Sequence, residues 1–279
     1  MTERADRNIE ALRTGHDLLA ARVRGFGEAD LTRPSGASEW DVSQVLSHLG
    51  SGAEIFLAVL DGALSGEGHP GGEFAQTVWA RWDAMSPTER AEAFVRSNDV
   101  LVTRYEELDA ATRKELRIDM GFMPVPVDVA TATGLRLSEF THHTWDIEVA
   151  FDPGATLSPE GTDLLIDHAG MLVGFLGKAD ALGGRQVTLA IRTTAPEREF
   201  GLDVRDPVAL AERGSDQETR PAVALVESPD RPDGVLTAPG EWWLRLVTGR
   251  HAPAHTPDSV ALTSDAITLD DLRRVFPGF

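Results

Sequence analysis

The sequence contains no cysteine among its 279 residues. Disulfide bonds, cysteine nucleophiles and thiolate ligands to a metal ion are therefore excluded. Any metal ion must be held by histidine and carboxylate side chains, and any thiol chemistry needs a thiol from outside the protein. Candidate metal ligands must therefore be sought among the 8 histidines and the 45 acidic residues.

Positive charge is also scarce. Lysine and arginine together number 26 against 45 acidic residues, which gives a net charge of -19 and argues against nucleic acid or anionic membrane surfaces as partners. No uninterrupted apolar run approaches the roughly 18 residues of a membrane span. Residues 1–15 lack the apolar core of a secretion signal. We therefore expect a cytoplasmic protein without a membrane or nucleic-acid partner.

The length favours two domains, because single hydrophobic cores stop growing near roughly 250–300 residues. The break Asp152-Pro153-Gly154 ends a helical pattern, and the residues beyond it mix helical and strand-like periodicity. The sequence thus predicts an α+β protein. Residues 1–154 form a helical domain, and residues 155–279 form a smaller α/β domain.

Apolar residues at three- to four-residue spacing predict four helices in the first domain, over residues 5–23, 40–62, 86–108 and 129–151. The prolines in Met120–Val127 place a loop before the last helix. Four helices with one long connection indicate a four-helix bundle. The second domain is expected to contain helices at 158–176 and 242–247, strands at 186–192 and 222–226, a short element at 267–275 and an acidic loop at 228–240.

Glu139 and His143 carry the sharpest chemical signal, because residues four apart lie on the same face of a helix. A catalytic zinc-type site needs three protein ligands and one open position, so a third ligand should come from a neighbouring helix. His48 fits that role, because it lies among apolar neighbours where an imidazole without a partner would be costly.

The spacing also permits plainer interpretations. A Glu and a His four apart often form only a weak surface pair, and a single helical His is often a core residue. His142 should point away from the Glu139–His143 face and be either a neighbour of the ligands or a surface residue. Asp146 could orient the His143 imidazole or serve as a cap.

Two segments, DVSQVLSHL at residues 41–49 after Trp40, and RLSE at 136–139 followed by His143 and WDI at 145–147, resemble the mycothiol-dependent maleylpyruvate isomerase family of the DinB-like superfamily. The resemblance spans the chain. It implies a DinB-like four-helix bundle that binds a divalent metal, followed by a sterol-carrier-like domain. The matching metal ligands are His48, Glu139 and His143.

The resemblance further implies mycothiol as thiol cofactor and a small unsaturated keto-acid-like substrate, acted on by an isomerase or an S-transferase. Gly249-Arg250 resembles the family's active-site arginine, which gives Arg250 a catalytic role, with Arg245 as the alternative. Zinc is the expected metal, and nickel, cobalt and manganese stay open. No residue is assigned to mycothiol, and the oligomeric state is undetermined. A metal-dependent hydrolase and a non-catalytic small-molecule binding protein remain alternatives.

Overall fold

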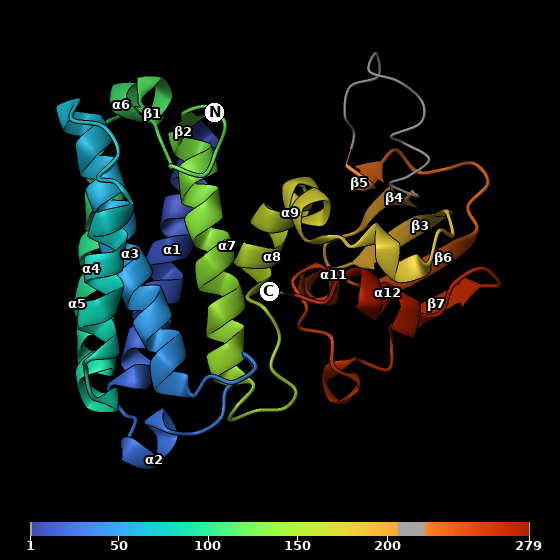
Figure 1. The fold of residues 1–279 in the computed structure, drawn as a ribbon, viewed down its shortest axis with the longest axis horizontal. Coiled ribbons are helices and arrows are strands. Elements are labelled where there is room, and N and C mark those ends of the chain that lie inside the picture. Colours follow the sequence, from blue (N-terminus) through green and yellow to red (C-terminus); the bar gives the residue numbers. More distant parts are fainter. Residues whose placement is uncertain (1, 206–220, 279) are drawn as a thin grey trace. The chain divides into compact units, whose positions relative to one another are not determined.

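The computed structural model describes residues 2–205 and 221–278 and contains two compact units, Met1–Ala155 and Thr156–Phe279 (Figure 1). The first unit is helical and the second is built on a mixed β-sheet. The α+β class predicted from the sequence is confirmed. Within the described residues, no helix combines the length and the apolar character needed to cross a membrane.

The first unit is organised around long helices that pack as a bundle (Figure 1). Helix α1 contacts α5 and α7, and α3 contacts the same two helices, so the four close a ring around a common core. The helices that form this bundle are α1 (Thr2–Val23), α3 (Val42–Ser65), α5 (Pro87–Glu106) and α7 (Val129–Glu148). All four correspond to the helices predicted from apolar spacing.

Side-chain caps fix where the helices begin. Asp41 accepts a hydrogen bond from the backbone N–H of Gln44 and starts α3. Ser86 caps α5 in a reciprocal pair with Glu89, which is the start that the sequence predicts. Asp128 caps α7 by accepting a hydrogen bond from the backbone N–H of Thr131. The register of each helix is thereby set locally.

Several elements of the first unit are absent from the sequence prediction. They are α2 (Glu28–Leu31), α4 (Gly72–Asp83), α6 (Ala110–Glu115) and the short strands β1 (Arg117–Ile118) and β2 (Val127–Asp128). Helix α4 packs against α3, where the ring of Trp82 lies on Gly50. A Cβ at Gly50 would lie 2.1 Å from that ring, so glycine allows the close approach.

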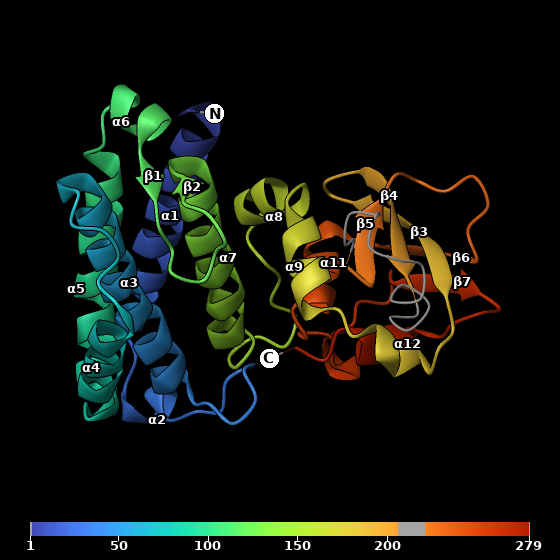
Figure 2. The ribbon, with the colours of Figure 1, turned by 45° about the horizontal axis from the view of Figure 1, so that its top comes forward.

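The second unit contains a five-stranded sheet in the order β5-β4-β3-β6-β7 (Figure 2). The pair β3–β6 is parallel and the other pairs are antiparallel. The strands are β3 (Val187–Thr194), β4 (Arg198–Val204), β5 (Val223–Val226), β6 (Gly234–Pro239) and β7 (Ala261–Ser264). The sequence predicts β3 and β5 but misses the other three. The prediction of an acidic loop at 228–240 is wrong in part, because β6 occupies the second half of this range and pairs with β3.

Short helices pack with this sheet. Helix α11 contacts β3, β6, α8 and α9, and each of its eight residues is buried. The helix expected at 158–176 is instead two helices, because the chain turns at Asp167 and His168. In residues 156–205 and 221–278 the helical elements are α8 (Pro159–Ile166), α9 (Ala169–Leu176), η1 (Ala179–Leu182), α11 (Gly240–Val247), η2 (Pro253–His255) and α12 (Leu269–Val275).

Candidate metal centre

Three side chains with metal-binding atoms converge between α3 and α7. Ligand atoms of His48, Glu139 and His143 all lie within 4.8 Å of one another. Nε2 of His48 is 2.9 Å from Oε2 of Glu139, and Nε2 of His143 is 3.7 Å from the same oxygen. In the described part of the chain, no other cluster of histidine and acidic side chains meets this criterion. The structure therefore brings together the three residues that the sequence predicts as metal ligands.

Helix register explains this convergence. Asp41 caps α3, and the helix begins at Val42. His48 therefore lies in the second turn of the helix. Glu139 and His143 are one turn apart on α7 and face the same side. Because α3 packs against α7, His48 meets this pair across the helix interface.

A glycine holds the loop before α3 against the end of α7. The backbone N–H of Gly36 donates to the carbonyl oxygen of Asp146 at 2.7 Å. A Cβ at Gly36 would lie 2.6 Å from a methyl carbon of Val149, so a larger residue would push the loop away. The loop ends at Trp40, whose ring centroid lies 5.4 Å from that of His48.

Asp146 orients the His143 imidazole. Its Oδ2 lies 2.9 Å from Nδ1 of His143, and its side chain is fully buried. An ionised carboxylate can only accept a hydrogen bond, so Nδ1 carries the proton. In the neutral ring the lone pair is then on Nε2, the nitrogen nearest Glu139. Of the two roles considered for Asp146, the orienting one matches this contact.

Glu139 is held as a carboxylate. Burial would raise its pKa, but in the metal-free site the hydrogen bond with His48 and the positive charges of Arg136 and of His143 and His48 in their protonated forms outweigh burial and lower the pKa to about 2. The carboxylate therefore stays ionised across the physiological range. Two imidazoles and one ionised carboxylate are a donor set that suits a zinc-type ion with one coordination position open to a ligand.

A buried arginine lies one turn before Glu139. Arg136 donates from Nη2 to the carbonyl oxygen of Leu49 at 2.8 Å and to Oδ1 of Asn98 at 2.7 Å. Burial lowers the pKa of Arg136 to about 10, so the guanidinium is still charged at neutral pH. Asn98 also bonds to the buried His16. The sequence spacing does not indicate this network, because its residues come from three different helices.

A pocket of about 350 Å³ adjoins the ligand His48. Its walls include indole rings and polar side chains from α3, α4, α5 and the loop before α3, namely Ser47, Trp79, Trp82, Asp83, Arg90 and Trp40. Trp40 also lies beside the other ligand histidine, with its ring centroid 6.2 Å from that of His143. The spacing of Trp79 and Trp82 on one face of a helix is the sequence signal that could have located this wall.

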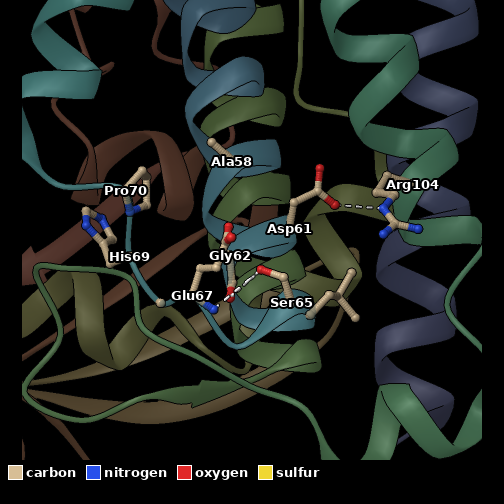
Figure 3. Close-up of a pocket in the computed structure, with 10 residues that line it drawn as sticks. Ala58, Asp61, Gly62, Ser65, Glu67, His69, Pro70 and Arg104 are labelled. Atoms are coloured by element: carbon tan, nitrogen blue, oxygen red, sulfur yellow. Dashed lines mark hydrogen bonds and ion pairs between the residues drawn. The ribbon is translucent and has the colours of Figure 1, made fainter.

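A larger hollow of about 750 Å³ lies at the other end of α3 (Figure 3). Asp61 and Arg104 pair across it, with Nε of Arg104 2.8 Å from Oδ1 of Asp61. Asp61 is thirteen residues after His48, which corresponds to about 20 Å along a helix. This hollow is therefore separate from the metal ligands, and nothing in the site chemistry requires it.

The remaining candidate residues have other surroundings. His142 is buried, with Nδ1 2.8 Å from the carbonyl oxygen of Ser138, so the surface position considered for it is wrong. Arg245 is buried and makes two hydrogen bonds with Glu241, at 2.7 and 2.9 Å, which is a structural role. Arg250 is half-buried after α11 and donates from Nη1 to the carbonyl oxygen of Thr248.

The model of the mycothiol maleylpyruvate isomerase N-terminal domain family matches residues 12–148. This match lies within the N-terminal unit. The resemblance seen in the sequence motifs is thereby confirmed, and the match contains the segments that carry His48, Glu139 and His143.

Two solved structures are similar to nearly the whole chain. One is a mycothiol-dependent maleylpyruvate isomerase, with a TM-score of 0.63 and 13% identity. The other is a mutant of a mycothiol-dependent maleylpyruvate isomerase in which a histidine is replaced by alanine, with a TM-score of 0.62 and 12% identity. Each match covers 95% of both chains and shows a shared two-part fold. Among curated proteins, none matches this chain.

Proposed function

We propose that this protein is a metal-dependent enzyme that uses mycothiol to transform a small electrophilic substrate, as an isomerase or as an S-transferase. The observation that carries the proposal is the convergence of His48, Glu139 and His143 within 4.8 Å, in a unit that matches the model of the mycothiol maleylpyruvate isomerase N-terminal domain family. The absence of cysteine is consistent with a thiol supplied by a cofactor.

The three ligands would hold a divalent ion, zinc being the expected one. Such an ion lowers the pKa of a bound thiol or water and so supplies a nucleophile at neutral pH. Glu139 would contribute the negative charge of the donor set, because a carboxylate is ionised at neutral pH. Asp146 holds His143 with Nε2 available, since Nδ1 donates to the carboxylate.

The protein also shapes the surroundings of this centre. The indole of Trp40 lies beside the imidazoles of His48 and His143. The pocket that adjoins His48 leaves room for a small molecule next to the ligands. We assign to Arg250, by the resemblance, the binding of a substrate carboxylate, because a guanidinium can donate two parallel hydrogen bonds to it.

The proposal is tested with the full-length protein loaded with zinc. Calorimetric titration should show specific binding of mycothiol, and turnover of an unsaturated keto acid should require both mycothiol and metal. An isomerase returns the thiol after each turnover, whereas an S-transferase consumes one thiol for each product formed. Metal-dependent hydrolysis without mycothiol would favour the hydrolase alternative, and ligand binding without turnover would favour the non-catalytic one. Either result would contradict the proposal.

A further inference from the structure

A buried arginine fills the interface between α3 and α7 next to the candidate metal ligands. Arg136 is 2% exposed and lies on α7, one turn before Glu139. Its guanidinium reaches the face of α3 that carries His48, because a Cβ at Gly52, one turn after His48, would lie 3.2 Å from Nη1 of Arg136. The ring centroid of Phe56, one further turn along this face, lies 5.7 Å from Cζ of the arginine. The guanidinium therefore forms the layer beside the ligands in this interface.

Hydrogen bonds from this guanidinium join three helices. Nη2 of Arg136 donates to the carbonyl oxygen of Leu49 on α3 and to Oδ1 of Asn98 on α5, at 2.8 and 2.7 Å. Leu49 directly follows His48 in the chain, so one of these acceptors belongs to the backbone beside a ligand. Asn98 is itself fixed, because its amide nitrogen lies 3.0 Å from Nδ1 of the buried His16. The arginine thus ties the two ligand-bearing helices to each other and to α5.

Core packing does not require a charge at this position. Removing an ion from water is costly, and replacing a buried ionic group by an apolar side chain of similar volume is often neutral or stabilising. Both acceptors of Arg136 are uncharged oxygens, so neither of them supplies a counter-charge. The carboxylate whose charge favours the charged guanidinium is that of Glu139, a candidate ligand. The arginine is therefore linked to the metal centre by its contacts and by its charge.

We propose that Arg136 is a positioning residue that holds His48 in register with Glu139 and His143 by fixing α3 against α7. The distances between a metal ion and its ligands are expected within about 0.2 Å of their ordinary values. Two of the candidate ligands are on α7 and one is on α3, so a small shift between these helices would separate them. A guanidinium suits this role, since its rigid fork directs its donors along fixed directions. This inference rests on the metal-dependent part of the proposed function and adds a residue that does not touch the metal.

The charge of Arg136 and its anchoring contacts predict opposite effects on metal affinity. Arg136→Met replaces the guanidinium by an apolar side chain. If the arginine acted through its charge alone, this variant would bind zinc as tightly as the parent or more tightly, because a positive charge repels a cation. If the arginine positions His48, the variant should bind zinc about tenfold more weakly, which is the lower end of the range for residues that support metal ligands.

Zinc affinity is measured in the full-length protein by competition with a chromophoric chelator, under conditions in which circular dichroism shows each variant to be folded. Arg104→Met is the matched control, because Arg104 also joins α5 to α3, through Asp61, but toward the other end of α3 from His48. Asn98→Leu removes the acceptor on α5 and keeps the charge of the arginine. It should also weaken zinc binding, and it decides the question if Arg136→Met does not fold. The visible spectrum of Co²⁺ bound in place of zinc should change in Arg136→Met, because the spectrum reports the arrangement of the ligands.

The outcomes separate this inference from the proposed function. Weaker zinc binding and an altered Co²⁺ spectrum in Arg136→Met, with parent-like values in Arg104→Met, would support the positioning role. Equal or tighter zinc binding in Arg136→Met or Asn98→Leu, or weaker binding with an unchanged Co²⁺ spectrum, would overturn it while the parent protein still binds metal. An equal loss in Arg104→Met would indicate a general loosening of the bundle and would overturn it as well. A parent protein that binds no divalent metal would overturn both this inference and the proposed function.

Discussion

The contact between Asp146 and His143 gives the sharpest prediction about the metal centre. Asp146→Asn keeps the shape of a fully buried side chain but removes the charge that accepts the proton of Nδ1 at 2.9 Å. A hydrogen bond to a charged group is worth about 1.5–3 kcal/mol. Mutation of a carboxylate that accepts a hydrogen bond from a metal-binding histidine typically lowers metal affinity by roughly 10–100-fold. The two ranges agree, since roughly 1.4 kcal/mol corresponds to a tenfold change.

Zinc affinity is measured by competition with a chromophoric chelator at neutral pH. Asp146→Asn should raise the dissociation constant by roughly 10–100-fold. Glu148→Gln is the control, because Glu148 lies on the same helix and pairs with Arg22 at 2.6 Å rather than with a ligand. It should bind zinc as the parent does. Equal affinity in Asp146→Asn and the parent, or an equal loss in both variants, would refute the role given to Asp146.

The other predictions concern separate parts of the chain. Arg250→Ala should keep a full complement of metal and lose turnover, and unchanged turnover would remove its assigned role. Limited proteolysis should cut first at residues 152–156, where most residues are exposed, and first cleavage within α3 would contradict a separable helical domain. Burial lowers the pKa of His16 from 6.5, so the unfolded chain binds its proton more readily and stability falls as pH drops below about 6.5. His16→Gln should therefore lose less stability than the parent between pH 7.5 and 5.5 in denaturant titrations, and an equal loss would exclude His16 as the cause.

The three candidate ligands could be predicted from the sequence because helical periodicity is clear in the segments that carry them. Glu139 and His143 are four residues apart on a helix with clear apolar spacing, and His48 lies among apolar neighbours on a second predicted helix. The network of Arg136, Asn98 and His16 could not be foreseen, because it joins α7, α5 and α1 through contacts that have no sequence periodicity.

The missed elements have weak local signals. Helix α4 buries only Val78 and Trp82 and has no side-chain cap, so its apolar stripe is thin. Strand β6 begins at Gly234 and ends at Pro239, residues that usually mark turns, and its place in the sheet comes from pairing with β3. The break between α8 and α9 contains neither glycine nor proline. Tertiary contacts, rather than local sequence preference, determine these three features.

The adjacent histidines of α7 provide the most direct test of the metal centre. His143 belongs to the ligand cluster, whereas His142 is buried on another face with Nδ1 2.8 Å from the carbonyl oxygen of Ser138. Both replacements by alanine should cost stability, but only one removes a ligand. Elemental analysis of the purified proteins should find metal in the parent and in His142→Ala, and little in His143→Ala. Equal metal content in the two variants, or a parent protein that binds no divalent metal, would contradict the account.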